Sequence, residues 1–276
     1  MERNVIIAST LEEAVGCKTP DAAFYAGGTE IGRLGSPVDA KTLILLKKIP
    51  ELYGIRMTGD PETENPSGSW LRIGAMCSFQ EILDCDAAPA WLKTAVRYLA
   101  SLPRRFKATV GGNIASWRSD SYLIPTLLAA GAKLEIAGME GGEDPDQNGN
   151  GAVPGRRILA LKDYMEEREQ LGNWLITAVY ADLSHDLKVL SEHFSNTAQS
   201  HAYLSLAMGK KGEDYRIGMA VAGCGIYAPG ILSWSRAWKE AGVRDDLYGS
   251  EEYKRYLAGI TLDEFYERLN QEASVN

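Results

Sequence analysis

The sequence predicts an α+β fold made of two domains. The chain has 276 residues, which exceeds the ~150 residues expected of one domain. Short apolar runs of strand character alternate with segments that begin at helix-capping residues. The character of the sequence changes around Leu171-Gly172-Asn173, after which strand-like runs dominate. We therefore predict a first domain over residues 1–172 and a smaller α+β domain over residues 173–276.

The composition is that of a soluble globular protein, with 45% hydrophobic and 24% charged residues. The formal net charge of −8 disfavours nucleic acid as a partner, because phosphate binding requires clustered Lys and Arg. No apolar run approaches the ~18 to 20 residues that a membrane span needs, and the run at residues 5–8 is too short for a secretory signal. We expect a cytoplasmic protein that binds neither nucleic acid nor membrane.

The cysteines and histidines indicate no metal site. The 4 cysteines form no CxxC pair and no tight cluster with histidine. His185, His193 and His201 are eight residues apart, which matches no usual zinc pattern. In a helix this spacing would place the three rings on one side, but we interpret them as surface or loop residues. We expect free thiols in a reducing compartment.

Two capping boxes predict helices in the first domain. In each box, a hydroxyl at the N-cap is followed three residues later by a carboxylate that can bond back to the cap. The boxes are Thr10 with Glu13, and Ser78 with Glu81. The apolar pattern predicts further helices at residues 91–102 and 121–130.

Apolar runs predict the strands. In the first domain they occur at residues 23–26, 41–46, 70–75 and 133–137. Residues 138–155, rich in Gly, Asp and Pro, are predicted to form an exposed, mobile loop. In the second domain we predict strands at residues 175–180 and 215–222. A third capping box, Thr261 with Glu264, predicts the start of a C-terminal helix.

Two glycine pairs follow apolar segments and carry polar side chains beside them. Glycine lets a backbone approach a ligand closely, and consecutive N–H groups in such a turn can form an anion-binding nest. Neither pair belongs to a Walker A or GxGxxG motif. The two segments are Ala26-Gly27-Gly28-Thr29-Glu30-Ile31 and Thr109-Val110-Gly111-Gly112-Asn113. One diphosphate bridging both would explain the pair, and two ordinary tight turns are the alternative.

These segments resemble the FAD-binding subunit of the xanthine dehydrogenase and carbon monoxide dehydrogenase family. That family has an AGGT-type loop near its N-terminus and a T-x-GGN-I loop roughly eighty residues later. The segments at residues 71–82 and 124–129 also match the family in order and spacing, and residues 250–257 resemble its closing segment. The similarity is strong over residues 23–136 and weaker after residue 172.

The resemblance implies a p-cresol methylhydroxylase-type FAD-binding domain, followed by a smaller α+β domain of the CO dehydrogenase flavoprotein type. It implies non-covalent FAD, and no histidine before His185 exists to attach the cofactor from the first domain. The residues that would contact FAD are Ala26, Gly27, Gly28, Thr29, Glu30, Ile31, Ala75, Thr109, Gly111, Gly112, Asn113 and Asp120.

The sequence departs from the family at two places. The family's ribose-binding aspartate is replaced by Tyr122, so Asp120, the nearest aspartate, is carried over instead. A basic stretch of the family's second domain is missing at residues 196–202, which questions a standard NAD site. Trp117 and Arg118 lie in the altered segment, where they would cover the adenine, with core packing of Trp117 as the alternative.

The resemblance implies electron relay as the function. Iron–sulfur clusters would pass electrons to FAD, which would deliver them to NAD or another acceptor. This chain has no cysteine spacing for such clusters, so [2Fe-2S] and molybdopterin are expected on partner subunits. Trp234, Trp238 and residues 253–256 are candidates for the interface, or for the core. The alternatives are a stand-alone FAD-dependent oxidase or reductase, and a non-enzymatic scaffold that has lost FAD.

Overall fold

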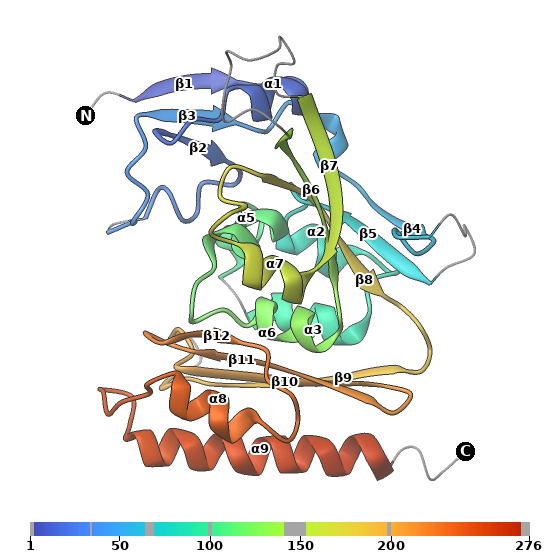
Figure 1. Cartoon of the computed structure of the whole chain (residues 1–276), viewed down its shortest axis with the longest axis vertical. Coiled ribbons are helices and arrows are strands. Elements are labelled where there is room, and N and C mark those ends of the chain that lie inside the picture. The colour runs from blue at the N-terminus through green and yellow to red at the C-terminus, as the bar shows by residue number, and fades with distance from the viewer. Residues whose placement is uncertain are drawn as a thin grey trace.

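The computed structural model describes residues 3–33, 35–63, 69–98, 101–140, 153–197 and 200–271. Its described strands form three sheets stacked along the long axis of the molecule (Figure 1). A small parallel sheet holds the N-terminal segment, a five-stranded sheet lies in the middle, and a four-stranded sheet and two helices close the opposite end. The predicted α+β class is thus confirmed.

The N-terminal sheet is parallel and has the order β1-β3-β2. Its strands are β1 (Asn4–Ile7), β2 (Ala22–Tyr25) and β3 (Thr42–Leu45). Helix α1 (Leu11–Gly16) connects β1 to β2 and begins where the sequence predicts, because Thr10 accepts a hydrogen bond from the Glu13 N–H. The segment with the first glycine pair leaves the end of β2, next to residues that follow β3.

The middle sheet has the order β4-β5-β8-β6-β7 and all its pairings are antiparallel. A 3-10 turn, η1 (Pro50–Leu52), precedes it. Its strands are β4 (Ile55–Thr58), β5 (Trp70–Gly74), β6 (Lys133–Glu140), β7 (Val153–Ala160) and β8 (Leu175–Asp182).

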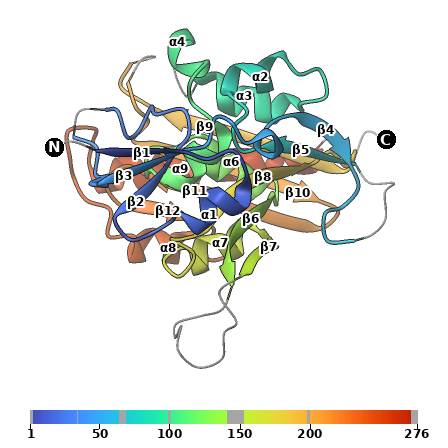
Figure 2. The same cartoon turned by 90° about the horizontal axis from the view of Figure 1, so that it is seen from above.

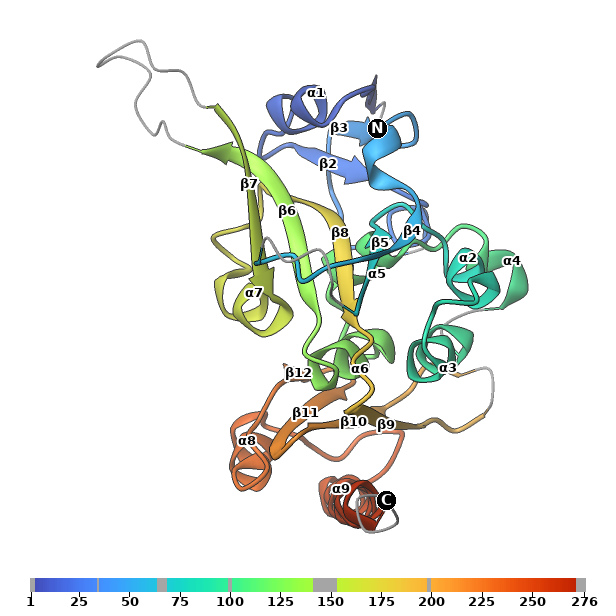
Figure 3. The same ribbon diagram turned by 90° about the vertical axis from the view of Figure 1, so that its right-hand side faces the viewer.

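Helices flank this sheet, and some of them lie between it and the C-terminal sheet (Figure 3). Helix α2 begins at the predicted capping box, in which Ser78 and Glu81 bond each other's backbone. The helices are α2 (Phe79–Asp84), α3 (Ala90–Tyr98), α4 (Leu102–Arg105), α5 (Val110–Ser116), α6 (Leu123–Ala129) and α7 (Leu161–Glu167).

The C-terminal sheet packs one face on α6 and the other on α9 (Glu251–Gln271). Two glycines permit the first contact: a Cβ at Gly209 or Gly218 would lie 1.9 Å or 2.1 Å from a carbonyl oxygen of α6. The sheet has the order β12-β11-β10-β9, and α8 (Trp234–Glu240) lies beside α9. Its strands are β9 (Leu187–Phe194), β10 (Leu204–Lys211), β11 (Asp214–Val221) and β12 (Gly225–Tyr227).

The junction between the two predicted domains lies within this arrangement. β8 follows residue 172 but pairs with β5 and β6, so it belongs to the middle sheet. The chain passes to the C-terminal sheet between Asp182 and Leu187. A turn, rather than a linker, explains the change of composition at 171–173. We propose that the second structural unit begins near residue 183.

Three local predictions were wrong. Thr261 lies inside the continuous helix α9 and is buried, so it caps nothing. Residues 138–140 and 153–155 extend β6 and β7 instead of forming a loop, while 141–152 lie outside the described residues. The helix predicted over 91–102 is described from Ala90 only to Tyr98, and residue 102 begins α4.

Candidate functional site

The segment from Ala26 to Ile31 lies where two cavities meet. The first cavity has a volume of about 620 Å³ and the second about 400 Å³. Residues Gly27 to Glu30, Gly112 and Ser116 line both. Ala26, Ile31 and Thr109 line only the second cavity, and Asn113 and Asp120 only the first. A ligand with two ends joined by a narrow linker therefore fits this arrangement.

The two glycine pairs are neighbours in space, as the sequence predicts. A Cβ at Gly112 would lie 3.6 Å from the Ala26 Cβ, and a Cβ at Gly27 would lie 1.6 Å from the Lys107 carbonyl oxygen. Gly28 has φ +73°, a left-handed conformation that favours glycine. These glycines let the first segment pass directly against the residues that precede α5.

Backbone donors of the first segment are free. Within the described part of the chain, the N–H groups from Gly27 to Ile31 donate no hydrogen bond to another protein atom. The Gly28 carbonyl instead accepts from the Gly32 N–H at 2.9 Å, which folds the segment into a turn. A row of unpaired N–H groups is the backbone arrangement that binds anions.

The second glycine pair has a different structure from the one predicted. Gly111 and Gly112 form the first turn of α5, with Thr109 as its N-cap. Their N–H groups already bond protein oxygens: Gly111 to the Ala75 carbonyl at 3.0 Å, and Gly112 to Thr109 Oγ1 at 3.2 Å. The unpaired backbone donors that such a nest requires are therefore found only in the first segment, because α5 uses its own N-terminal donors.

Ala75 and Gly111 lie behind the cavities rather than in their walls. Ala75 is 5% exposed, and a Cβ at Gly111 would lie 2.6 Å from its Cβ. The Ala75 N–H donates to the Thr177 carbonyl of β8, and its own carbonyl accepts from Gly111. These two residues fix α5 against the middle sheet, so their contribution to a ligand site is positional.

Because the glycine N–H groups of the second segment are already bonded, its free donors have to come from side chains. Asn113 Oδ1 accepts from the Ser121 hydroxyl at 3.3 Å, which leaves the Asn113 amide N–H₂ facing the first cavity. The assignment of the two amide atoms follows this hydrogen bond. Ser116 also lines both cavities, but its hydroxyl hydrogen is donated to the Asn113 carbonyl at 2.7 Å, so Asn113 is the donor that remains.

Charged side chains make the first cavity cationic in an otherwise acidic chain. Glu30 and Asp120 are its only carboxylates among the described lining residues. Its cations are Arg33, Arg104, Lys107 and Arg118. Arg104 and Lys107 have no ion-pair partner in the regions that the structure describes. Such a surface favours an anionic ligand.

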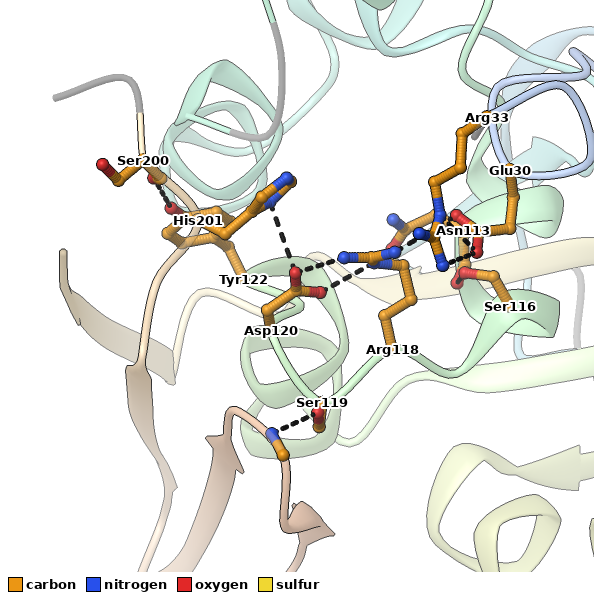
Figure 4. A network of polar contacts seen from close by, with 11 residues as sticks. Glu30, Arg33, Asn113, Ser116, Arg118, Ser119, Asp120, Tyr122, Ser200 and His201 are labelled. Carbon is orange, nitrogen blue, oxygen red and sulfur yellow. Dashed lines mark hydrogen bonds and ion pairs between the residues drawn. The ribbon is translucent and has the colours of Figure 1, made fainter. Parts of the chain in front are cut away.

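A chain of ion pairs crosses this cavity (Figure 4). Arg118 Nε donates to Asp120 at 2.8 Å, and its Nη1 reaches Glu30 at 3.4 Å. Arg33 holds the other oxygen of Glu30 at 2.8 Å. His201 Nδ1, from the second structural unit, lies 3.3 Å from Asp120. The hydrogen bond that Arg118 donates to Asp120 raises the pKa of Arg118, so the guanidinium stays charged.

The positions at which the sequence departs from the family have defined contacts in the structure. Tyr122 donates its hydroxyl to the Ser200 carbonyl at 3.3 Å and is buried, so it bridges the two units. Asp120 lines the first cavity, but both of its oxygens bond Arg118. Trp117 packs against the core, with the Arg168 guanidinium 5.5 Å from its ring, which supports the core alternative.

Some of the histidines and proposed interface residues are buried in the structure and others are exposed. His193 lies in β9 between the rings of Tyr98 and Tyr122, and burial lowers its pKa. Trp238 is 1% exposed and belongs to the C-terminal core, so it forms no surface. Tyr253 and Tyr256 are 47% and 63% exposed.

In the described residues we find no helix that could cross a membrane.

Solved structures define the class of fold. A chain of reconstituted CO dehydrogenase from Oligotropha carboxidovorans superposes with a TM-score of 0.71 and 20% identity, covering 95% of each chain. A chain of quinoline 2-oxidoreductase from Pseudomonas putida 86 gives a TM-score of 0.72 and 18% identity, covering 99% of this chain and 98% of that one. These likenesses establish the fold predicted from the resemblance.

The sequence then identifies the family. A model described as "FAD binding domain in molybdopterin dehydrogenase" matches residues 1–145. This match spans more than half of the chain, so the protein belongs to that family of FAD-binding domains. The predicted relationship to the flavoprotein subunits of molybdenum hydroxylases is confirmed.

Two curated proteins are similar to this chain in sequence. The uncharacterized protein YgfM of Escherichia coli K12 is 28% identical over 261 residues, 91% of this chain and 89% of YgfM. Xanthine dehydrogenase of Drosophila pseudoobscura pseudoobscura is 32% identical over 148 residues, 49% of this chain but 11% of that protein. The match to xanthine dehydrogenase therefore covers about half of this chain but only a short region of the longer enzyme.

FAD is the cofactor that this family implies, and the residues present fit its diphosphate. The unpaired N–H groups from Gly27 to Ile31 suit phosphate oxygens, and the Asn113 amide adds a side-chain donor. A cavity lies on either side for the two ends of the dinucleotide. Sequence reasoning did not single out Arg33, Arg104 or Lys107, because only the fold brings them to the glycine segment.

Proposed function

We propose that this chain binds FAD non-covalently and relays electrons within a multi-subunit molybdenum hydroxylase. The observation that carries this proposal is the row of unpaired N–H groups from Gly27 to Ile31, at the junction of two cavities. Bound FAD would accept electrons singly and release them in pairs. The proposed contact residues remain Ala26, Gly27, Gly28, Thr29, Glu30, Ile31, Thr109, Gly112, Asn113 and Asp120, with Ala75 and Gly111 behind them.

The protein's own residues would hold the cofactor by three kinds of contact. Backbone N–H groups of residues 27–31 would bind the diphosphate oxygens. Arg104 and Lys107, which lack an ion-pair partner among the described residues, would neutralise the phosphate charge. Glu30 would not repel that charge strongly, because Arg33 and Arg118 both contact it. The cationic wall thus offsets the two carboxylates.

The remaining centres belong, in this proposal, to other subunits. We propose that an iron–sulfur subunit and a molybdopterin subunit accompany this chain in the cytoplasm. The solved CO dehydrogenase from Hydrogenophaga pseudoflava, whose matching chain has a TM-score of 0.69, supports an assembly of this kind. NAD or another electron acceptor would receive the electrons, although the basic stretch of the family's second domain is absent here.

The flavin content of the purified full-length chain tests this proposal. We expect a yellow protein that releases close to one FAD per chain on heat denaturation, measured by chromatography against FAD and FMN standards. A colourless protein that gains no FAD at saturating concentration would support the scaffold that has lost its cofactor. Turnover of an oxidisable substrate by the isolated chain would support the stand-alone oxidase instead.

A further inference from the structure

We infer that the exposed surface formed by the end of α3 and by α4 is the docking site for an acidic iron–sulfur protein. This inference rests on the proposed function and names the surface through which the partner would reach the flavin site. The surface comprises Arg97, Tyr98, Leu102, Arg104, Phe106 and Lys107, and we call it the α4 patch.

The charge distribution of the sequence sets this segment apart. The chain has 37 acidic and 29 basic residues, yet no Asp or Glu occurs from residue 87 to residue 119. The same stretch contains six basic residues: Lys93, Arg97, Arg104, Arg105, Lys107 and Arg118. A local surplus of positive charge on an acidic protein attracts an acidic surface selectively and orients it during encounter.

The patch exposes large apolar side chains to solvent, which is energetically unfavourable. Tyr98 is 56% exposed, Leu102 53% and Phe106 63%. They lie between exposed cations, and neither Arg97, Arg104 nor Lys107 has an ion-pair partner in the described residues. Apolar and aromatic groups surrounded by unpaired Arg and Lys have the composition of an interface rather than of a solvated face.

The patch is held in place by contacts from both structural units. Arg105 Nη1 donates to the Arg97 carbonyl at 3.0 Å, which ties α4 to the end of α3. The Tyr98 ring lies 4.6 Å from the His193 ring of β9. Helices α2, α3 and α4 lie together at one side of the molecule (Figure 2). A preordered surface of this kind loses little conformational entropy on binding.

The patch adjoins the candidate flavin site. Arg104 and Lys107 belong to the patch and also line the first cavity. The Lys107 carbonyl lies against Gly27 of the first glycine segment. A protein docked on the patch would therefore cover one wall of that cavity. Electron-transfer partners typically use small interfaces with strong electrostatic steering, which suits a few exposed apolar side chains beside exposed cations.

A protein partner fits these observations better than a nucleic acid or a second copy. The net charge of −8 repels a polyphosphate at long range. A second copy would bring the same cations to face one another in a symmetric interface, since the patch contains no carboxylate. An acidic protein satisfies both the charge and the exposed aromatic side chains.

The test uses the complex as it occurs in the native host. A tagged full-length chain is purified at low salt, and the co-purifying subunits are identified by mass spectrometry, iron content and visible spectrum. The purified iron–sulfur subunit is then titrated against the chain at 50 mM and 500 mM NaCl. The variants are Leu102→Asp/Phe106→Asp and Arg97→Glu, all outside the cavity lining, with Leu232→Asp/Leu247→Asp as the matched control on exposed leucines.

We expect Leu102→Asp/Phe106→Asp to weaken binding about 30- to 100-fold, as the loss of a central apolar contact does. Arg97→Glu should slow association about tenfold at 50 mM salt and little at 500 mM salt, because salt screens an exposed charge. The control variant should bind like the wild type. Unchanged affinity in both patch variants would overturn the inference, as would the absence of any iron–sulfur subunit.

The same samples separate failure of this inference from failure of the proposed function. FAD content is measured in every variant, and the patch variants should keep it. A chain without FAD that still binds the iron–sulfur subunit through the patch refutes the flavin proposal alone. Binding of a fluorescent 20-nucleotide strand, or self-association in sedimentation velocity, that is lost in the patch variants would assign the patch to another partner and overturn the inference.

Discussion

Gly28 occupies a position where two requirements coincide. Its φ of +73° lies in the left-handed region, and a Cβ there would lie 2.1 Å from the Tyr25 hydroxyl oxygen. Gly35 has the same φ of +73°, but a Cβ there would meet nothing within 4 Å. The two glycines thus share the backbone strain of a substitution and differ in the space around it.

This pair defines a matched experiment. Gly28→Ala should lose FAD affinity at least tenfold, because the added Cβ displaces Tyr25 and distorts the N–H groups that would bind phosphate. Gly35→Ala should cost a similar ~1–2 kcal/mol of left-handed strain but keep the affinity of the wild type. Flavin fluorescence titration measures the affinity and thermal unfolding measures the strain. Equal FAD affinity in both variants would contradict the placement of the diphosphate at Gly28.

Arg118 and Asp120 make unequal contributions to the cavity. Arg118 contacts both carboxylates of the first cavity, whereas Asp120 serves mainly to orient Arg118. Arg118→Met should therefore weaken FAD binding about 10- to 100-fold, since Glu30 and Asp120 would then face the phosphates with less compensation. Asp120→Ala should weaken it only a few-fold. Calorimetry distinguishes the two, and a larger effect of Asp120→Ala would point to direct contact of Asp120 with the cofactor.

At the scale of elements, the middle sheet contains a buried ion pair. Glu135 of β6 accepts hydrogen bonds from Thr177 at 2.7 Å and Tyr180 at 2.8 Å, both on β8. Arg72 of β5 lies 3.5 Å away and is 7% exposed. Burial alone would raise the pKa of Glu135, but the two hydroxyls and the arginines hold it below the ordinary value of 4.5. These contacts join three adjacent strands.

The sign of this shift determines the pH dependence. Because the pKa is lower in the folded state, the stabilisation from Glu135 is present above pH ~4.5 and is lost as the pH falls through the folded value. Glu135→Gln should lower the free energy of unfolding by about 3 kcal/mol at neutral pH, since it leaves Arg72 buried without a counter-charge. Urea unfolding between pH 3 and 7 should show the difference shrinking toward low pH.

The control for this variant is Glu167→Gln. Glu167 forms an ion pair with Arg157 at 3.2 Å, and both side chains are 41% exposed. Removing an exposed pair of this kind should change the free energy of unfolding by less than ~1 kcal/mol. If the two variants lost equal stability at neutral pH, the buried network would have no special role in the sheet.

Elements with local signals were predicted well from the sequence. The caps at Thr10 and Ser78 act within one helical turn, so their sequence pattern is sufficient. Thr261 shows the same pattern but lies inside α9, where tertiary packing of the buried helix face outweighs a local cap. The sequence predicts a loop at the N-terminus of α5, because two adjacent glycines suggest a turn. Thr109 caps this helix without a capping box, since Gly112 stands where a carboxylate would be needed.

The charged part of the candidate site could not be predicted in the same way. Arg118 and Glu30 are 88 residues apart in sequence, and His201 lies outside the strands, between β9 and β10. Such contacts depend on the packing of whole units, which no short motif encodes. The glycine segment was predicted because its chemistry is local and because a family resemblance supplied its partner segment. The sequence thus indicated where the candidate site lies, whereas its charge balance became visible only in the fold.

At the scale of the whole molecule, contacts across the candidate site join the two structural units. Asp120 contacts His201, Tyr122 bonds Ser200, and the Ser119 hydroxyl accepts from the Gly223 N–H at 3.0 Å (Figure 4). All three residues on the first side belong to the segment that leads from α5 to α6. A ligand that orders this segment should therefore stabilise both units together rather than the first alone.

Thermal unfolding with different flavins tests this coupling and the site at once. FAD at 100 times its Kd should stabilise the chain by about 2.7 kcal/mol and raise Tm by roughly 5 °C, in one transition. Riboflavin at the same concentration should raise Tm by less than about 1 °C, because it lacks the diphosphate for the N–H groups of residues 27–31. ADP should give an intermediate shift, since it carries the diphosphate without the isoalloxazine. An equal shift with riboflavin and FAD would exclude diphosphate recognition, and two separate transitions would exclude coupling through the segment between α5 and α6.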